Sequence, residues 1–231
     1  MREIVLDTET TGLDPNEGHR VVEIGAVELV NHIPTGRVYQ EYINPERDMP
    51  AEAEQVHGLS EAFLRDKPVF SAIAESFLMF LDTDGHGEPS PGTLVIHNAA
   101  FDMKFLNSEL THLGHAAIGH DRVIDTLHLA RQRFPGAPAN LDALCRRFDV
   151  DTSARTKHGA LLDSELLAEV YLGLIGGRQP GLDLAIQGRG KKAEVTRERA
   201  HRPPRPHAPS AAELEAHQAF LQQIKDPLWS R

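Results

Sequence analysis

The chain has little cysteine, little tryptophan and no long apolar run. Cys145 is its only cysteine, which excludes an internal disulfide and a metal cage built from several thiolates. No stretch of eighteen apolar residues occurs, and the start of the chain lacks an apolar signal segment. We therefore expect neither a membrane span nor a signal peptide, and a reducing, cytoplasmic location fits best.

Positive charge is also scarce. The chain has 24 Lys and Arg residues against 34 Asp and Glu residues, a formal net charge of −10. Taken alone, this balance argues against a nucleic-acid partner. The acidic excess lies before residue 189, whereas basic residues outnumber acidic ones after it. An acidic body can still bind a polyanion if divalent cations neutralise the contact point, because a bound metal inverts the local charge.

Hydrophobic patterning predicts an α/β fold. We expect strands at residues 3–7, 20–30, 38–43, 93–97 and 122–125, with a turn at residues 31–36. Helical patterns occupy residues 51–82, 100–113, 126–134, 140–148 and 161–174. Three strands in hairpin-like succession, followed by alternating helices and strands, predict a mixed five-stranded sheet flanked by helices.

The composition changes after residue 177. Residues 187–210 are rich in Gly, Pro, Arg and Lys, which predicts a flexible linker to a C-terminal tail. Ser210 and Glu213 then have the spacing of a capping box, and apolar residues follow at helical spacing. We expect a body at residues 1–178 and a separate helical segment at residues 211–231.

Three short stretches, far apart in the chain, carry candidate metal ligands. Asp7 and Glu9 are two apart on a predicted strand, so both carboxylates project from one face. Asp102 lies in the first turn of a helix that Asn98 could cap, directly after another buried strand. Each alone has a structural explanation: a solvated strand end for the first pair, and a favourable helix-dipole partner for Asp102.

The third stretch contains His158 and Asp163. At five residues apart on one helix they would point about 140° away from each other. They can converge only if His158 lies on the loop before Gly159 and Asp163 lies in the first turns of the helix. A lone histidine is more often structural, but together with Asp7, Glu9 and Asp102 it completes a set. Four carboxylates can hold two divalent cations, and a histidine can take a proton from water, which suits phosphodiester hydrolysis.

At these residues the chain resembles the DEDDh exonucleases. The three motifs are Asp7-Thr8-Glu9-Thr10-Thr11-Gly12-Leu13, His97-Asn98-Ala99-Ala100-Phe101-Asp102, and His158 with Asp163. More closely, the chain is similar to the members of that family that proofread for bacterial replicative DNA polymerases, over about residues 3–178. The resemblance implies a ribonuclease H-like fold and 3′→5′ removal of mononucleotides from a DNA 3′ end during replication.

The resemblance also implies a role for each site residue. Asp7, Glu9, Asp102 and Asp163 would hold two divalent cations, Mg²⁺ or Mn²⁺, and His158 would be the general base. Contacts to the terminal nucleotide are implied for Asp7, Glu9, Glu52, His57, Phe101 and Asp163. A surface charge for Glu52 and a core aromatic for Phe101 remain alternatives. Asp125, at a strand-to-helix junction, is expected to be a helix cap rather than a ligand.

The tail implies two partners. Residues 179–186 resemble a short motif that binds the sliding clamp, through Gln179, Leu182 and Leu184. Residues 211–231 resemble a segment that binds the polymerase alpha subunit, with Leu214, Phe220, Leu221 and Trp229 as candidate contacts. Two other functions remain open. The motifs bind phosphate and metal, so a related exonuclease acting on RNA 3′ ends fits them, and a non-enzymatic adaptor between clamp and polymerase fits the tail.

Overall fold

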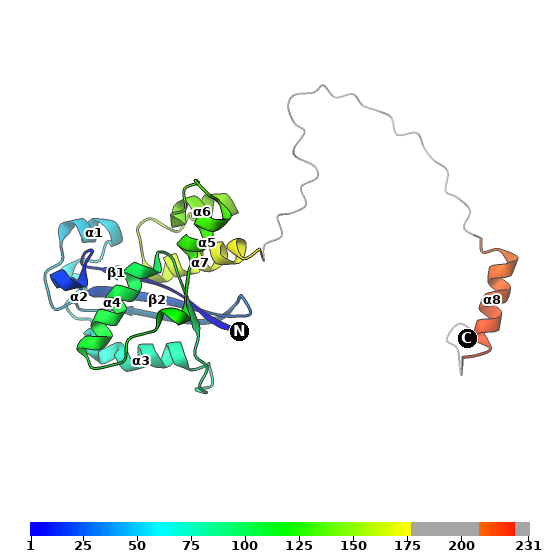
Figure 1. Cartoon of the computed structure of the whole chain (residues 1–231), viewed down its shortest axis with the longest axis horizontal. Helices are drawn as coiled ribbons and strands as arrows, with labels where there is room; N and C mark the ends of the chain where they lie inside the picture. The colour runs from blue at the N-terminus through cyan, green and yellow to red at the C-terminus, as the bar shows by residue number, and fades with distance from the viewer. Residues whose placement is uncertain (177–207, 225–231) are drawn as a thin grey trace, which may run out of the picture. The chain divides into compact units, whose positions relative to one another are not determined.

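The computed structural model describes residues 1–176 and 208–224 (Figure 1). The first range contains the folded body, and the second contains a single helix. Among these residues, no helix is long and apolar enough to cross a membrane.

The body is built on one mixed five-stranded sheet, as predicted from the sequence. Its strands are β1 (Arg2–Thr10), β2 (Val21–Val30), β3 (Ile33–Tyr42), β4 (Thr93–Ile96) and β5 (Val123–Asp125). Their order across the sheet is β3-β2-β1-β4-β5. The β1–β2 and β2–β3 pairs are antiparallel, whereas the β1–β4 and β4–β5 pairs are parallel. The central strand β1 is therefore buried between neighbours, which suits its apolar run.

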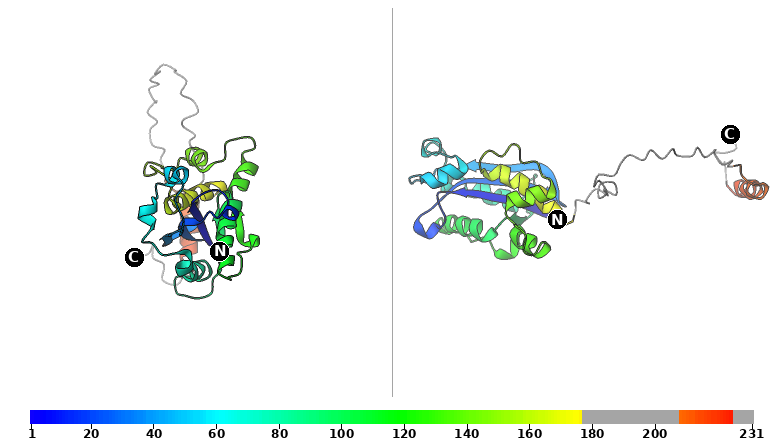
Figure 2. Two further views of the ribbon diagram at one scale, coloured as in Figure 1. Left: turned by 90° about the vertical axis from the view of Figure 1, so that its left-hand side faces the viewer. Right: turned by 90° about the horizontal axis from the view of Figure 1, so that it is seen from above.

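Helices cover both faces of this sheet (Figures 1 and 2). The helices of the body are α1 (Ala51–His57), α2 (Glu61–Leu64), α3 (Phe70–Asp82), α4 (Ala99–His112), α5 (Thr126–Arg133), α6 (Leu141–Phe148) and α7 (Ala160–Leu174), with short 3-10 turns η1 (Pro15–Glu17) and η2 (His120–Arg122). One buried cluster joins α3 and α4 to Ile4 and Leu6, and the other joins α5, α6 and α7 to Val5. Alternation along β1 thus sends successive side chains into opposite core layers.

Side-chain caps define several helix starts. Asn140 accepts a hydrogen bond from the Ala143 amide at the start of α6, as expected. Asp125 caps α5 through the Leu127 and His128 amides, which confirms its expected role. Asn98 occupies the cap position of α4 with a left-handed backbone, but its side chain makes no cap hydrogen bond there. Asn98 is therefore at the cap position that the sequence suggested, but it does not cap α4 through its side chain.

Two strand boundaries differ from the sequence prediction. The strand expected to end at Asp7 continues to Thr10, so its acidic pair lies within β1 rather than at its end. The turn expected at residues 31–36 is only two residues long. Asn31 and His32 both have positive φ values, 51° and 67°, the geometry of a tight hairpin turn. Pro34 suggested a longer turn, but a proline is tolerated in β3 because that strand is at the sheet edge.

The second described range contains α8 (Ala211–Leu221). Its capping box is present as predicted, because the Ser210 side chain accepts from the Glu213 amide while the Glu213 side chain accepts from the Ser210 amide. Leu214 and Phe220 are 51% and 58% exposed, and Leu221 is half-buried.

Candidate active site

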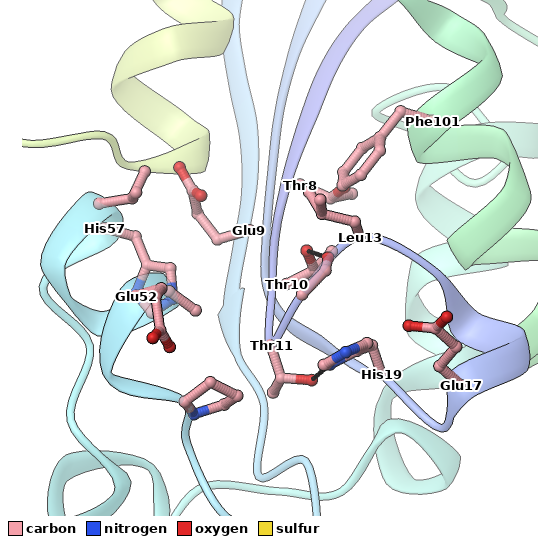
Figure 3. Close-up of a pocket in the computed structure, with 14 residues that line it drawn as sticks. Thr8, Glu9, Thr10, Thr11, Leu13, Glu17, His19, Glu52, His57 and Phe101 are labelled. Atoms are coloured by element: carbon pink, nitrogen blue, oxygen red, sulfur yellow. Dashed lines mark hydrogen bonds between the residues drawn. The ribbon is translucent and has the colours of Figure 1, made fainter.

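The acidic pair of β1 lies where the strand extends past its parallel neighbour. The β1–β4 pairing covers only Glu3 to Val5, whereas the β1–β2 pairing continues through Asp7 and Glu9. Asp7 is half-buried and Glu9 is 8% exposed. Figure 3 shows the Glu9 side chain directed from β1 toward the start of α7.

Asp102 reaches the same part of β1 from α4. Its Oδ1 accepts a hydrogen bond of 3.1 Å from the Thr8 amide and one of 2.7 Å from the Thr8 hydroxyl. Thr8 separates Asp7 from Glu9 in the chain, so these two contacts bring the second motif to the first. Asp102 is 3% exposed.

The third motif, His158 with Asp163, lies at the start of α7. Asp163 lies in the first turn of that helix, and His158 lies on the loop before Gly159, which confirms the expected arrangement. Ligand atoms of Glu9, His158 and Asp163 all lie within 4.8 Å of one another. The Nδ1 atom of His158 is 3.2 Å from Oδ2 of Asp163, and the His158 side chain is half exposed.

Crowding of buried carboxylates raises their pKa values. Burial, together with the charges of Asp163, Glu23 and Asp102, raises the pKa of Glu9 to about 8. Burial raises the pKa of Asp102 to about 7, although hydrogen bonds from Thr8 oppose the shift. The pKa of Asp7 is raised well above its usual value by burial and by its acidic neighbours. The site is therefore short of positive charge, and its oxygen donors fit hard divalent cations.

A close contact between β2 and α7 holds Asp163 near β1. The buried Glu23 side chain accepts a hydrogen bond of 3.1 Å from the Ala160 amide at the start of α7. The Ser164 hydroxyl donates to the Gly25 carbonyl at 2.9 Å. Gly25 pairs with Asp7 in the sheet, and a Cβ atom at Gly25 would lie only 2.1 Å from the Ala160 carbonyl carbon. Helix α7 can approach this closely only because Gly25 has no side chain.

Arg155 is a site residue that sequence reasoning missed. Its guanidinium donates to both carboxylate oxygens of Asp163, at 2.6 and 2.7 Å. It also donates to Asp142 at the start of α6 and lies 2.8 Å from His158 Nδ1. No motif or periodicity marks Arg155. Glu23 did carry a signal, because a charged residue inside an apolar strand needs a buried partner.

A cavity of about 460 Å³ adjoins the acidic cluster. Figure 3 shows Glu52 and His57 on its α1 side, facing Phe101 of α4 and His19 across it. His57 is buried, and burial lowers its pKa below the usual value. Glu52 is exposed. Phe101 packs against Phe105, with ring centroids 5.0 Å apart, yet it also lines the cavity. Of the six residues implied to contact the terminal nucleotide, Glu9, Glu52, His57 and Phe101 line this cavity, whereas Asp7 and Asp163 do not.

The predicted partner-binding residues are only partly described. Leu214, Phe220 and Leu221 lie on α8. Gln179, Leu182, Leu184 and Trp229 lie outside the described residues, as does most of the linker predicted at residues 187–210.

Comparison with known proteins identifies the family. The exonuclease family model, RNase_T, matches residues 4–171. A curated protein of Rickettsia felis, DNA polymerase III subunit epsilon, is 49% identical over 230 residues, covering 97% of this chain and 97% of that protein. This chain belongs to the DNA polymerase III epsilon family of exonucleases. The Escherichia coli family member is 44% identical over 194 residues, covering 81% of this chain and 76% of its own length.

Solved structures agree with the fold. The nuclease domain of 3′hExo, described as a DEDDh family member bound to rAMP, superposes with a TM-score of 0.63 at 19% identity, covering 76% of this chain and 92% of that domain. At this identity the likeness concerns the fold alone. Epsilon-family membership confirms the resemblance seen in the sequence, and the chain is a 3′→5′ exonuclease of DNA replication. The family also implies divalent metal ions as cofactors.

Proposed function

We propose that this chain removes mispaired nucleotides, one at a time, from the 3′ end of a DNA primer by phosphodiester hydrolysis. One observation carries the proposal. Glu9, Asp102 and Asp163 are nearly buried together, with Asp7 beside them, and the pKa of Glu9 is raised to about 8 by burial and acidic neighbours. These carboxyl groups stay deprotonated near neutral pH only if bound cations offset their negative charge.

In this proposal Asp7, Glu9, Asp102 and Asp163 hold two divalent cations, Mg²⁺ or Mn²⁺. Their all-oxygen donors favour these hard ions. When bound, two such ions would lower the pKa of water and offset charge on the attacking and leaving oxygens. The Thr8 hydrogen bonds keep Asp102 beside β1, and the Glu23 contact keeps Asp163 beside Glu9.

His158 acts as the general base. Its half-exposed ring lies on a loop, within hydrogen-bond reach of Asp163. It can therefore take a proton from the attacking water and release it to solvent. In the tautomer whose Nδ1–H donates to Asp163, the opposite ring nitrogen, Nε2, is unprotonated and accepts this proton.

The cavity beside the cluster binds the terminal nucleotide. Glu52 and His57 supply polar groups on its α1 side, and the Phe101 ring supplies an apolar surface across from them. An aromatic surface suits a base or a sugar, and the acidic side of the cavity brings the scissile phosphate to the cations.

The direct test is release of mononucleotides from a 5′-labelled primer in Mg²⁺ or Mn²⁺. His158→Gln should slow release roughly 100- to 10,000-fold, the usual contribution of a general base. Asp7→Asn should abolish release while the fold remains intact. The exposed His86→Gln is a matched control and should retain the wild-type rate. Full activity of either site variant would refute the assignment.

Substrate choice needs a separate comparison. Matched DNA and RNA oligonucleotides, each with a paired or mispaired 3′ end, should show faster cleavage of DNA and of the mispaired end. A clear preference for RNA would favour the alternative of an exonuclease acting on RNA 3′ ends.

We also propose that the chain acts within a replicative polymerase assembly in the cytoplasm. Relatives are named as subunits of DNA polymerase III. Residues 211–231 would bind the polymerase III alpha subunit, supported by exposed Leu214 and Phe220 on a capped helix. Residues 179–186 would bind the sliding clamp. Both contacts would keep the exonuclease near the primer end, so weak intrinsic DNA affinity suffices.

A further inference from the structure

Arg155 contacts Asp163 and His158 of the acidic site, and its role there is not explained by the proposed chemistry. Its side chain is 10% exposed, and that of Asp163 is 4% exposed. Both oxygens of the Asp163 carboxylate accept hydrogen bonds from Arg155, in a fork geometry typical of strong pairs. The same guanidinium lies 2.8 Å from His158 Nδ1. Arg155 therefore contacts both the general base and a proposed metal ligand.

These contacts conflict with a cation on Asp163. A divalent ion binds carboxylate oxygens at roughly 2.0–2.6 Å and requires their lone pairs. The guanidinium already takes one lone pair of each oxygen, and its positive charge repels a second cation at this separation. A metal ion therefore binds Asp163 more tightly if Arg155 withdraws from at least one of the two oxygens.

A second carboxylate can stay paired with Arg155 when Arg155 moves away from Asp163. Asp142, at the start of α6, accepts a hydrogen bond from the other end of the guanidinium and is 51% exposed. A groove of about 210 Å³ beside Arg155 is lined by Asp142, Thr152 and Thr156, among others. The side chain can thus move outward toward Asp142 without losing every charged partner.

We propose that Arg155 is an internal counter-cation on Asp163 and His158, and that it competes with a divalent ion for the Asp163 carboxylate. The proposal rests on the metal site assigned above. Arg155 would then weaken metal binding while it stabilises the metal-free fold, since it neutralises one of the crowded carboxylates.

A role for Arg155 in positioning Asp163 predicts the opposite change in metal affinity. If Arg155 only positioned Asp163 for the metal, removing it would weaken metal binding. If it competes with the metal, removing it strengthens binding. The sign of the change in metal affinity therefore decides between a competing cation and a positioning residue.

The experiment is calorimetric titration of Mn²⁺ into the full chain. Losing hydrogen bonds to a charged group corresponds to roughly a tenfold to hundredfold change in affinity, so Arg155→Gln should bind Mn²⁺ tighter by about that factor. Arg155→Lys keeps the charge without the fork and should lie between the variant and wild type. Arg146→Gln, an exposed arginine on α6, is the matched control and should bind like wild type.

Thermal unfolding gives an independent readout. In EDTA, Arg155→Gln should melt at a lower temperature than wild type, and saturating Mn²⁺ should reduce or remove that difference. Equal or weaker Mn²⁺ affinity in Arg155→Gln would overturn the inference. If that variant does not fold, equal or weaker affinity in Arg155→Lys has the same consequence. Absence of Mn²⁺ binding in wild type and variants alike would instead refute the metal site itself.

Discussion

At the scale of single residues, burial of neighbouring carboxylates has the largest effect on the pKa values of the site. Glu9 and Asp102 are each less than one-tenth exposed, and their pKa values are raised to about 8 and about 7, in both cases mainly by burial. The positive charge of Arg155 opposes the rise in the pKa of Glu9. Glu9 and Asp102 therefore lose their protons at a higher pH than carboxyl groups usually do.

This shift predicts how stability depends on pH. The folded chain binds protons at Glu9 and Asp102 more tightly than the unfolded chain. The resulting stabilisation is complete below the ordinary carboxyl pKa and is lost as the pH rises through about 7 to about 8. In EDTA, the melting temperature should therefore fall as the pH rises through this window. Mg²⁺ should counteract the fall, most strongly at the upper end, because it replaces the lost protons.

Thermal unfolding at stepped pH, with EDTA and then with Mg²⁺, checks this prediction. Glu9→Gln removes the group with the higher of these two pKa values and should flatten the slope measured in EDTA. A melting temperature that is constant or rises across the window in EDTA would show that these carboxylates do not hold the expected protons.

At the scale of elements, the contact between β2 and α7 determines where Asp163 lies. Glu23 accepts from the first amide of α7, and the Ser164 hydroxyl of α7 donates to the Gly25 carbonyl. The helix backbone fills the space where a Gly25 side chain would lie. Because Glu23 and Gly25 are register partners of Glu9 and Asp7, any shift of α7 changes the separation of the carboxylates.

Gly25→Ala should therefore impair both catalysis and stability. The added methyl meets backbone atoms, which cannot rotate away, so α7 must move. Overpacking of this kind typically costs about 1–3 kcal/mol, whereas a misplaced catalytic group about 1 Å away can cost roughly 100-fold in rate. Unfolding in denaturant and the rate of nucleotide release measure the two effects.

Gly85→Ala provides a matched control. No heavy atom lies within 4 Å of the Cβ position at Gly85, so this variant should change neither property. A wild-type rate in Gly25→Ala would mean that α7 can adjust without moving Asp163.

At the scale of the whole molecule, the described residues fall into two parts. Residues 1–176 contain both core clusters and the whole acidic site. The described part of the tail is α8, which exposes Leu214 and Phe220. Burying such side chains against a partner contributes roughly 1.5–3 kcal/mol each. The acidic body and the more basic tail also differ in charge.

Truncation tests this division. A chain of residues 1–178 should retain metal-dependent nucleotide release but lose binding to the polymerase III alpha subunit, measured by pull-down or gel filtration. The double variant Leu214→Ser, Phe220→Ser in the full chain should weaken the same binding and leave the nuclease rate unchanged. Polymerase binding that survives truncation would refute the tail assignment. Retained nuclease activity would also exclude a purely non-enzymatic adaptor.

Much of this protein follows from local patterns in its sequence. The alternation along β1, the caps Asp125 and Asn140, and the capping box at Ser210 each depend on a few neighbouring residues, so periodicity and residue type predict them. The spacing of His158 and Asp163 likewise required a loop followed by a helix. The length of β1 and the tight turn at Asn31 were predicted wrongly, because pairing with β2 and the edge position of β3 override local preference.

The sequence by itself determined which residues could carry the chemistry, because acid pairs, histidines and helix starts are local features. Only the tertiary structure decided three contacts: Asp102 accepts hydrogen bonds from Thr8, Glu23 accepts one from the start of α7, and Arg155 donates to Asp163. These partners are brought together by β2, α4, α6 and α7. The physical reason is desolvation: a carboxylate's charge becomes costly only when packing removes water, and packing joins segments that are distant in the chain.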